Sequence, residues 1–381
     1  MNAALVASMA GCLRVAPGLP LPHSLASSRV DWAQRLSAGQ PCKALPGLMA
    51  SLFSLCGNAH RLCAQLAVDA ARGEPGGLRH EEVARRLRLE AAQEHVRRIG
   101  LDWPRLLASG SEAVAKAAVA DLAACPVLQS PGVADWSAMG SWLRSRWLGM
   151  SPADWLSAWN AQAGDGLLRW SQATPGWLPC LVAQARPFDA GAPALAQERA
   201  LRVHESDTAL RRLSERLSHE PGFSQQPLWE GAAAHTGSWA RLHHFGLPAS
   251  VLSPWALLGS RLAELARLCL EDGAASHGAQ CLRWGALQPQ PGVGLAWVEM
   301  ARGLLVHQVT LDAGGDSVGR CRVVAPTEWN FHPLGEVAQR LSALDVCAPA
   351  VERQVGLLMA AFDPCVPYGL VAGAMQEVAH A

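Results

Sequence analysis

Apolar residues recur every three or four positions along most of this chain, which is the spacing of one buried face of an α-helix. Residues 78–99 show the pattern clearly, with Val83, Leu87 and Ala91 on one face and charged residues on the other. Further helices are predicted for residues 201–217, for residues 256–270 ending before Gly273, and for residues 349–362 with Pro349 in the first turn. This spacing restricts the chain to a mainly α fold.

One stretch departs from helical spacing. Residues 303–311 and 318–325 alternate in polarity and are rich in β-branched side chains, and the intervening letters DAGGD are typical of a turn. A small β-hairpin element is therefore predicted near the C-terminal end. Because the Pro- and Ala-rich stretch 179–193 interrupts the periodicity, we expect one unit with possible lobes at residues 1–185 and 194–381.

Charge and hydropathy exclude several classes of partner. The 32 Lys and Arg residues balance the 32 Asp and Glu residues, which removes the electrostatic case for nucleic acid. No apolar run approaches the ~18 residues of a membrane span, and the apolar stretch before Cys12 is too short for a signal peptide. The 11 cysteines include no CxxC pair, as expected for reduced thiols. We expect a cytoplasmic protein with no membrane insertion and no nucleic-acid partner.

Two cysteines stand out by their local sequences. The letters CGNAH at residues 56–60 precede a predicted helix at residues 61–72, so Cys56 and His60 share a helical face, which Cys63 roughly extends. A buried packing cysteine is commoner than a metal ligand, so spacing alone leaves both interpretations open. Cys365 lies in the sequence DPCVPY, where Asp-Pro forces the chain out of a helix and into a rigid turn.

Taken together, five motifs resemble the large subunits of nickel–iron hydrogenases. Residues 56–60 resemble the end of that family's RxCGxCxxxH motif, and residues 363–365 resemble the start of its DPCxxCxxH motif. Between them, ARGLLVH at 301–307 is similar to APRGxLxH, and VAPTEWNFHP at 324–333 is similar to VPTTWNxxP. Residues 89–99, which include His95, resemble more faintly the helix that follows the first motif in that family. The resemblance implies a large-subunit-like architecture over residues 1–381.

The departures from these motifs concern the metal ligands. Ser51 and Phe53 stand where the first motif has its Arg and its first Cys, and Tyr368 and Val371 stand where the second motif has its second Cys and its His. The family's site uses four thiolates, and only Cys56 and Cys365 remain in matching positions. Nickel would lose half of its soft ligands, so we expect no nickel and no enzymatic activity.

The resemblance also implies a pocket for the iron ligands cyanide and carbon monoxide. The family positions matched by Arg302, Pro326 and Thr327 surround these ligands, and a guanidinium and a hydroxyl suit an anionic acceptor such as cyanide. Leu305 or Ala325 would supply the apolar wall that carbon monoxide prefers. His60 is expected to donate a hydrogen bond to a thiolate rather than to bind metal itself.

A shortened large-subunit-like chain with half of the thiolates resembles the HoxV/HupK group of hydrogenase accessory proteins. That resemblance implies a maturation scaffold that holds or assembles an Fe(CN)2CO unit between Cys56 and Cys365, or between Cys56 and a ligand such as Cys63. The implied partners are HypC/HypD-type maturation proteins and the hydrogenase large subunit precursor. The alternative is a metal-free regulatory protein of hydrogenase assembly in which the cysteines are relics. A redox enzyme with an unrelated metal site is the third possibility, and no other Cys, His or carboxylate spacing favours it.

Overall fold

A computed structural model describes residues 11–74, 79–108, 110–129, 132, 134–189, 194–245, 252–270 and 282–371. Helices dominate these residues. The α-helices are α2 (Trp32–Ser37), α3 (Leu45–Leu52), α4 (Gly57–Arg72), α5 (His80–Arg97), α6 (Trp103–Leu107), α7 (Glu112–Ala123), α8 (Pro126–Gln129), α9 (Trp136–Leu143), α10 (Pro152–Ala173), α11 (Trp177–Ala185), α12 (Asp207–His219), α13 (Pro254–Leu270), α14 (Pro326–Asn330), α15 (Glu336–Ser342) and α16 (Val351–Phe362). The strands are β1 (Leu13–Val15), β2 (Leu25–Ser27), β3 (Trp284–Gln290), β4 (Val293–Met300), β5 (Gly303–Leu311), β6 (Val318–Val324) and β7 (Tyr368–Leu370).

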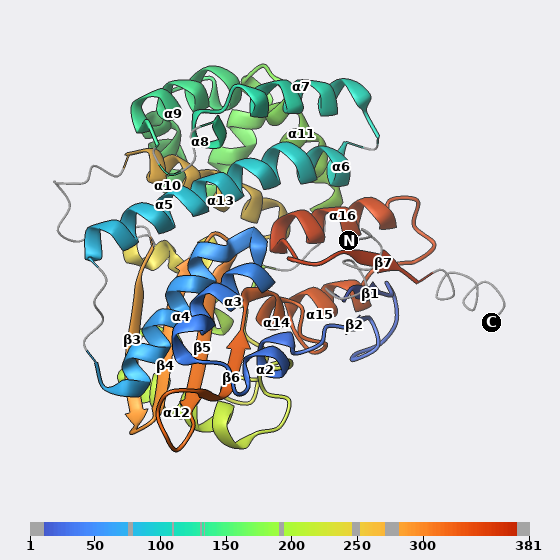
Figure 1. Cartoon of the computed structure of the whole chain (residues 1–381). Helices are drawn as coiled ribbons and strands as arrows, with labels where there is room; N and C mark the ends of the chain where they lie inside the picture. The colour runs from blue at the N-terminus through green and yellow to red at the C-terminus, as the bar shows by residue number, and fades with distance from the viewer. Residues whose placement is uncertain are drawn as a thin grey trace.

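A layer of helices covers one end of the larger sheet. Figure 1 shows α5 to α11 together with α13 on one side, and the four-stranded sheet with α3, α4 and α12 on the other. Helix α13 lies at the centre of the helical layer, where it packs against α10, α16, α5 and α9. Its residues from Pro254 to Leu268 are all buried, because α13 is surrounded by other helices rather than exposed on one face.

The larger sheet is antiparallel with strand order β3-β4-β5-β6. Alternate residues of β5 face opposite layers, so that Leu305 packs in the main core and Leu304 packs in the smaller core with the leucines of α12. Helix α4 lies directly on β4. A Cβ on Gly294 would stand 1.9 Å from the Ala67 carbonyl oxygen, so only glycine permits this approach. The contact fixes the helix that follows Cys56.

A smaller sheet joins the two ends of the described chain. Its strand order is β2-β1-β7, and β1 pairs with β7 in parallel, with Leu13 opposite Tyr368. This pairing holds the segment that contains Cys365 against the N-terminal strands.

The predicted helices and hairpin are confirmed, with corrected bounds. Helix α12 starts at Asp207, and Leu201 precedes it. Helix α16 begins at Val351 with Ala350 as its N-cap, so Pro349 lies before the helix and not in its first turn. Residue 78 and Gly273 lie outside the described residues. Strands β3 and β4 extend the predicted hairpin into a four-stranded sheet that the sequence pattern did not indicate.

The stretch expected to separate two lobes is partly helical. Helix α11 covers Trp177–Ala185, and a 3-10 turn continues through Arg186–Asp189, so the interpretation of these residues as aperiodic was wrong. Leu178, Leu181 and Val182 are buried on the face that this helix presents to its neighbours. The two-lobe division remains a prediction. In the part of the chain described here, no helix is long and apolar enough to cross a membrane.

Candidate functional site

One cavity gathers nearly all the residues that the motifs pointed to. It encloses about 400 Å³, and its wall includes Cys56 and Cys365 from the two cysteine motifs. The other predicted residues that line it are His60, Arg302, Ala325, Pro326 and Thr327. The two cysteines, far apart in sequence, therefore face a common space.

The first cysteine motif is held in place by α5. Cys56 is buried and forms the N-cap of α4, after a 3-10 turn at Ser54–Cys56. A helix N-terminus has unpaired backbone N–H groups. Here the Glu90 carboxylate accepts hydrogen bonds from the N–H groups of Asn58 at 2.7 Å and Ala59 at 2.8 Å. The Cys56 backbone is thus fixed from a second helix.

The second cysteine motif is fixed by the buried carboxylate of Asp363. This residue ends α16 in the left-handed conformation, with φ 53° and ψ 72°, which turns the chain toward Cys365. Its carboxylate forms ion pairs with Arg98 at 3.0 Å, Arg261 at 3.1 Å and Arg302 at 3.4 Å. Burial alone would raise the pKa of Asp363, but these guanidinium groups lower it. Asp363 is therefore ionised and ties three elements to the turn.

The sulfur of Cys365 has two hydrogen-bond donors. Arg29 Nη1 lies 2.8 Å from Sγ, and the Thr327 hydroxyl lies 3.1 Å from Sγ. Arg29 is itself held by Glu328, whose Oε1 is 3.1 Å from Arg29 Nε, and Glu328 Oε2 accepts the Ala325 N–H at 3.1 Å. A guanidinium and a hydroxyl both favour a negatively charged sulfur. The Thr327 hydroxyl is thus directed to Cys365.

Arg302 is the buried cation of the cavity. Its guanidinium pairs with Glu94 through Nη1 and with Asp363 through Nε, and Nη2 has no hydrogen-bond partner among the described residues. The residue is only 2% exposed. Burial opposes the charge, but Asp363 and Glu94 raise the pKa of Arg302, so it is always a cation. A buried N–H without a partner is costly and marks a place for an acceptor.

Cys56 differs from Cys365 in its surroundings. Burial raises the pKa of the Cys56 thiol, and the positive charge of Arg302 opposes that effect only in part. Cys56 is therefore a thiol when nothing is bound. A metal that binds Cys56 must displace its proton, because only the thiolate is a metal ligand.

His60 does not have the partner that the sequence suggested. Its Nδ1 lies 3.0 Å from Nε2 of His307, and its ring stacks on Phe53 with centroids 3.9 Å apart. Burial lowers the pKa of His60 well below its usual value, and the neighbouring His307 lowers it further, so the ring is neutral. Phe53, which occupies the position of the first motif's missing cysteine, fills that space with an aromatic ring.

Two candidates lie outside this cavity. Leu305 is fully buried in β5 and is not part of the cavity wall, so Ala325 supplies the apolar surface that was assigned to either residue. Cys63 points at β4, where its Sγ lies 3.4 Å from the Ala296 carbonyl oxygen. That position does not support Cys63 as a partner of Cys56. Within the described ranges, no group of three or more His, Cys, Asp or Glu side chains is arranged to hold a metal ion.

Sequence reasoning missed the side chains that support the two cysteines. Arg29 lies in the loop after β2 and carries no motif, so no local signal connected it to Cys365. Glu94 lies in α5, within the region that matched the family faintly. That match was the only sequence signal for its role beside Arg302. Asp363 was part of a matched motif, but the arginines that surround it come from distant positions, so its supporting role became visible only in the structure.

The fold defines the class of protein. The chain shares its architecture with solved hydrogenases, including an NAD+-reducing [NiFe]-hydrogenase, with 15% identity, a TM-score of 0.51 and coverage of 90% of this chain and 91% of that one. The Ni-Fe-Se hydrogenase from Desulfomicrobium baculatum gives a TM-score of 0.53 at 13% identity, over 90% and 93% of the chains. These likenesses establish the fold of a NiFe hydrogenase large subunit.

The sequence comparisons identify the family. The chain is 40% identical to the hydrogenase expression/formation protein HoxV of Cupriavidus necator, over 98% of this chain and 99% of HoxV. It is 31% identical to the hydrogenase expression/formation protein HupK of Bradyrhizobium diazoefficiens, over 91% of each chain. No protein-family model matches the sequence. The chain belongs to the HoxV/HupK family of hydrogenase expression/formation proteins.

Proposed function

We propose that this protein is a non-enzymatic maturation scaffold that carries an Fe(CN)2CO unit, as cargo, between Cys56 and Cys365. The observation that carries the proposal is the arrangement of one cavity wall. It combines these two cysteines with the buried, partly unpaired guanidinium of Arg302. Soft iron prefers sulfur ligands. A cyanide on that iron would accept hydrogen bonds from the N–H groups of Arg302 Nη2.

The remaining wall suits the rest of the cargo. Ala325, Val323 and Phe331 supply apolar surface of the kind that a carbonyl ligand prefers. Arg29 and Thr327 both donate to Cys365, which favours that sulfur as an anionic ligand. Among the described residues, no group of three or more His, Cys, Asp or Glu side chains is arranged to hold a metal ion, so two thiolates suit a unit that brings its own diatomic ligands better than they suit a bare nickel ion.

The same ligand set makes release possible. A recipient with more thiolates binds the unit more tightly than two cysteines can, so transfer is downhill once the two proteins meet. On this proposal the source of the unit is a HypC/HypD-type maturation protein and the recipient is the precursor of a hydrogenase large subunit. Both partners are part of the proposal, and the relatives' name as hydrogenase expression/formation proteins supports a role in the same process.

The experiment is to measure iron bound per chain after anaerobic purification from cells that mature a hydrogenase. We expect Cys56→Ser and Cys365→Ser each to lose most of the iron. Cys63→Ser and Cys321→Ser are matched controls because both cysteines are buried outside the cavity wall, and we expect each to keep its iron. Equal iron content in all variants would contradict the proposal and favour a metal-free regulatory protein.

A further inference from the structure

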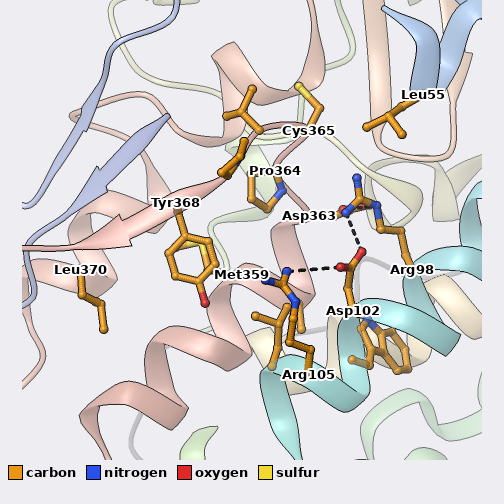
Figure 2. Close-up of a pocket in the computed structure, with 15 residues that line it drawn as sticks. Leu55, Arg98, Asp102, Arg105, Met359, Asp363, Pro364, Cys365, Tyr368 and Leu370 are labelled. Carbon is orange, nitrogen blue, oxygen red and sulfur yellow. Dashed lines mark hydrogen bonds and ion pairs between the residues drawn. The ribbon is translucent and has the colours of Figure 1, made fainter. Parts of the chain in front are cut away.

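Cys365 lies between two cavities. A second cavity of about 530 Å³ lies on the other side of the turn, and Leu55, Cys365 and Val366 belong to both walls. Cys56 lines only the first cavity. Figure 2 shows Cys365 and Pro364 at the upper side of the second cavity, Arg98, Asp102 and Arg105 to the right and below, and Tyr368 to the left. A molecule in this second cavity would reach Cys365 without passing Cys56.

One wall of the second cavity is the open edge of a sheet. Strand β7 is the last strand of its sheet and pairs only with β1 within the described residues. In the observed register, Val371 N–H binds the Val15 carbonyl and Leu13 N–H binds the Pro367 carbonyl. Because groups alternate along a strand, the N–H and C=O groups of Tyr368 and Leu370 point away from β1. Among the described residues these groups have no strand partner, so they can pair with an added strand.

The most exposed charge in this cavity wall is the guanidinium of Arg105, since the side chains of Arg98, Asp102 and Asp363 are only 18%, 24% and 4% exposed. Arg98 and Arg105 share one carboxylate, with distances to Asp102 of 2.6 Å and 3.3 Å. The second carboxylate in the wall, Asp363, is already shared by three guanidinium groups. Arg105 is 69% exposed and is available to an acidic partner group.

Apolar side chains complete the surface. Leu55 and Leu370 are 49% and 42% exposed at the cavity, and Leu101 beside Asp102 is 51% exposed. Trp103 and Met359 lie in its wall. Large exposed leucines grouped around a concave site are typical of surfaces that bind other proteins.

We propose that this second cavity is the docking site for an extended segment of a partner protein, with apolar side chains and a flanking acidic group. The segment adds to the free edge of β7, places an apolar side chain among Leu55, Leu370 and Met359, and sets its carboxylate on Arg105. Strand addition gives main-chain hydrogen bonds, and the pocket and the charge select the sequence.

The position of the docked segment bears on release of the cargo, and this part rests on the proposed function. A cysteine of the partner can approach the iron on the Cys365 side while Cys56 still holds it. The partner's sulfur forms a bond to iron as the bond from iron to Cys365 breaks, the partner's thiol proton passes to Cys365, and iron keeps its oxidation state. Transfer thus needs no oxidant or reductant.

The test uses the full-length protein and a hydrogenase large subunit precursor purified anaerobically, with binding followed by biolayer interferometry. Leu370→Pro removes an N–H from the free edge without touching the bonds to β1, and Arg105→Glu reverses the charge. We expect each to weaken binding at least tenfold. Arg212→Glu on α12 is the matched control, because Arg212 is 60% exposed and, like Arg105, forms a long ion pair, here with Glu230 at 3.6 Å. We expect this variant to bind like the wild type.

Cyanide and carbonyl infrared bands, recorded on the same preparations, separate the two proposals. Bands at the wild-type level in Leu370→Pro and Arg105→Glu, combined with lost binding, support a docking site that is distinct from the cargo site. Unchanged binding in both variants, or no binding by the wild type, overturns the docking proposal whatever the bands show. A truncation after residue 371 that binds more tightly would assign the edge to the chain's own C-terminal residues and would also overturn it. Absence of bands in the wild type contradicts the cargo proposal alone.

Discussion

Arg29 and Cys365 are 336 residues apart in sequence, yet Nη1 of the arginine donates to the cysteine sulfur at 2.8 Å. The contact joins the loop after β2 to the turn after α16. It is supported on one side by Glu328 and on the other by Thr327. The anionic ligand expected at Cys365 therefore depends on a residue that belongs to neither cysteine motif.

Replacing Arg29 should weaken retention of the iron unit. A hydrogen bond to a charged group is worth about 1.5–3 kcal/mol, so we expect Arg29→Gln to lower iron affinity by ~10- to 100-fold. The iron affinity of Arg29→Lys should lie between those of the wild type and Arg29→Gln. An ammonium keeps the charge but cannot bridge both Cys365 and Glu328 with a planar fork. Iron retained after dialysis against a chelator measures the effect. Arg35→Gln in α2 is the control, and equal losses in both glutamine variants would refute the assignment.

Removing the charge of Asp363 should destabilise the whole protein. Asp363→Asn would leave Arg98, Arg261 and Arg302 without their common buried carboxylate, and breaking such a buried pair costs about 3–5 kcal/mol. Urea unfolding followed by tryptophan fluorescence measures the change. The control is Asp316→Asn, since Asp316 is 96% exposed and its ion pair is long. A loss confined to iron binding, with unfolding unchanged, would contradict this structural role.

Stability should fall in mild acid because of the buried histidine pair. Burial lowers the pKa of His307 to about 3, from about 6.5 in an unfolded chain. Above pH 6.5 both states are neutral and the protein has its full stability. As the pH falls from 6.5 toward 3, only the unfolded chain takes up the proton, so the free energy of unfolding decreases by up to about 1.4 kcal/mol per pH unit.

His307→Gln should flatten this pH dependence of the urea midpoint between pH 6.5 and pH 5. The exposed His23→Gln should leave the pH dependence as it is in the wild type. An unchanged slope in His307→Gln would show that the pair with His60 is not the acid-sensitive element.

Glu90 should control the order of the first cysteine motif. Glu90→Ala would leave the buried Ala59 N–H without its acceptor, together with the Asn58 N–H, at a cost of about 1–3 kcal/mol. We expect faster hydrogen exchange at both amides and lower iron content. Glu215→Ala, an exposed substitution in the middle of α12, is the control. If exchange at Asn58 and Ala59 did not change, another group would have to cap α4.

Local patterns predicted the elements that have a clear period. The spacing of Val83, Leu87 and Ala91 marks α5, and the alternation on both sides of DAGGD marks β5 and β6. Strand β3 was missed because it contains Gly285 and Pro289, and β4 was missed because its almost continuous burial hides the two-residue period. Strands of three residues, such as β1 and β7, are too short to show any period.

The site could be predicted only as far as its motifs reach. Cys56 and Cys365 stood out by local sequence, the resemblance paired them and added Arg302 and Thr327, and the structure places all four around one cavity. The buried ion pairs that position them depend on contacts between residues far apart in sequence. Such contacts leave no local spacing, and Leu305 shows that a residue inside a matched motif can still face away from the site.

The most direct test of the central claim is an infrared spectrum of the wild-type protein and of Cys56→Ser, both purified anaerobically from cells with a complete hydrogenase maturation system. The proposal predicts cyanide and carbonyl stretching bands of an iron unit in the wild type and their loss in Cys56→Ser. A wild-type protein without such bands, from cells that do mature their hydrogenase, would contradict it.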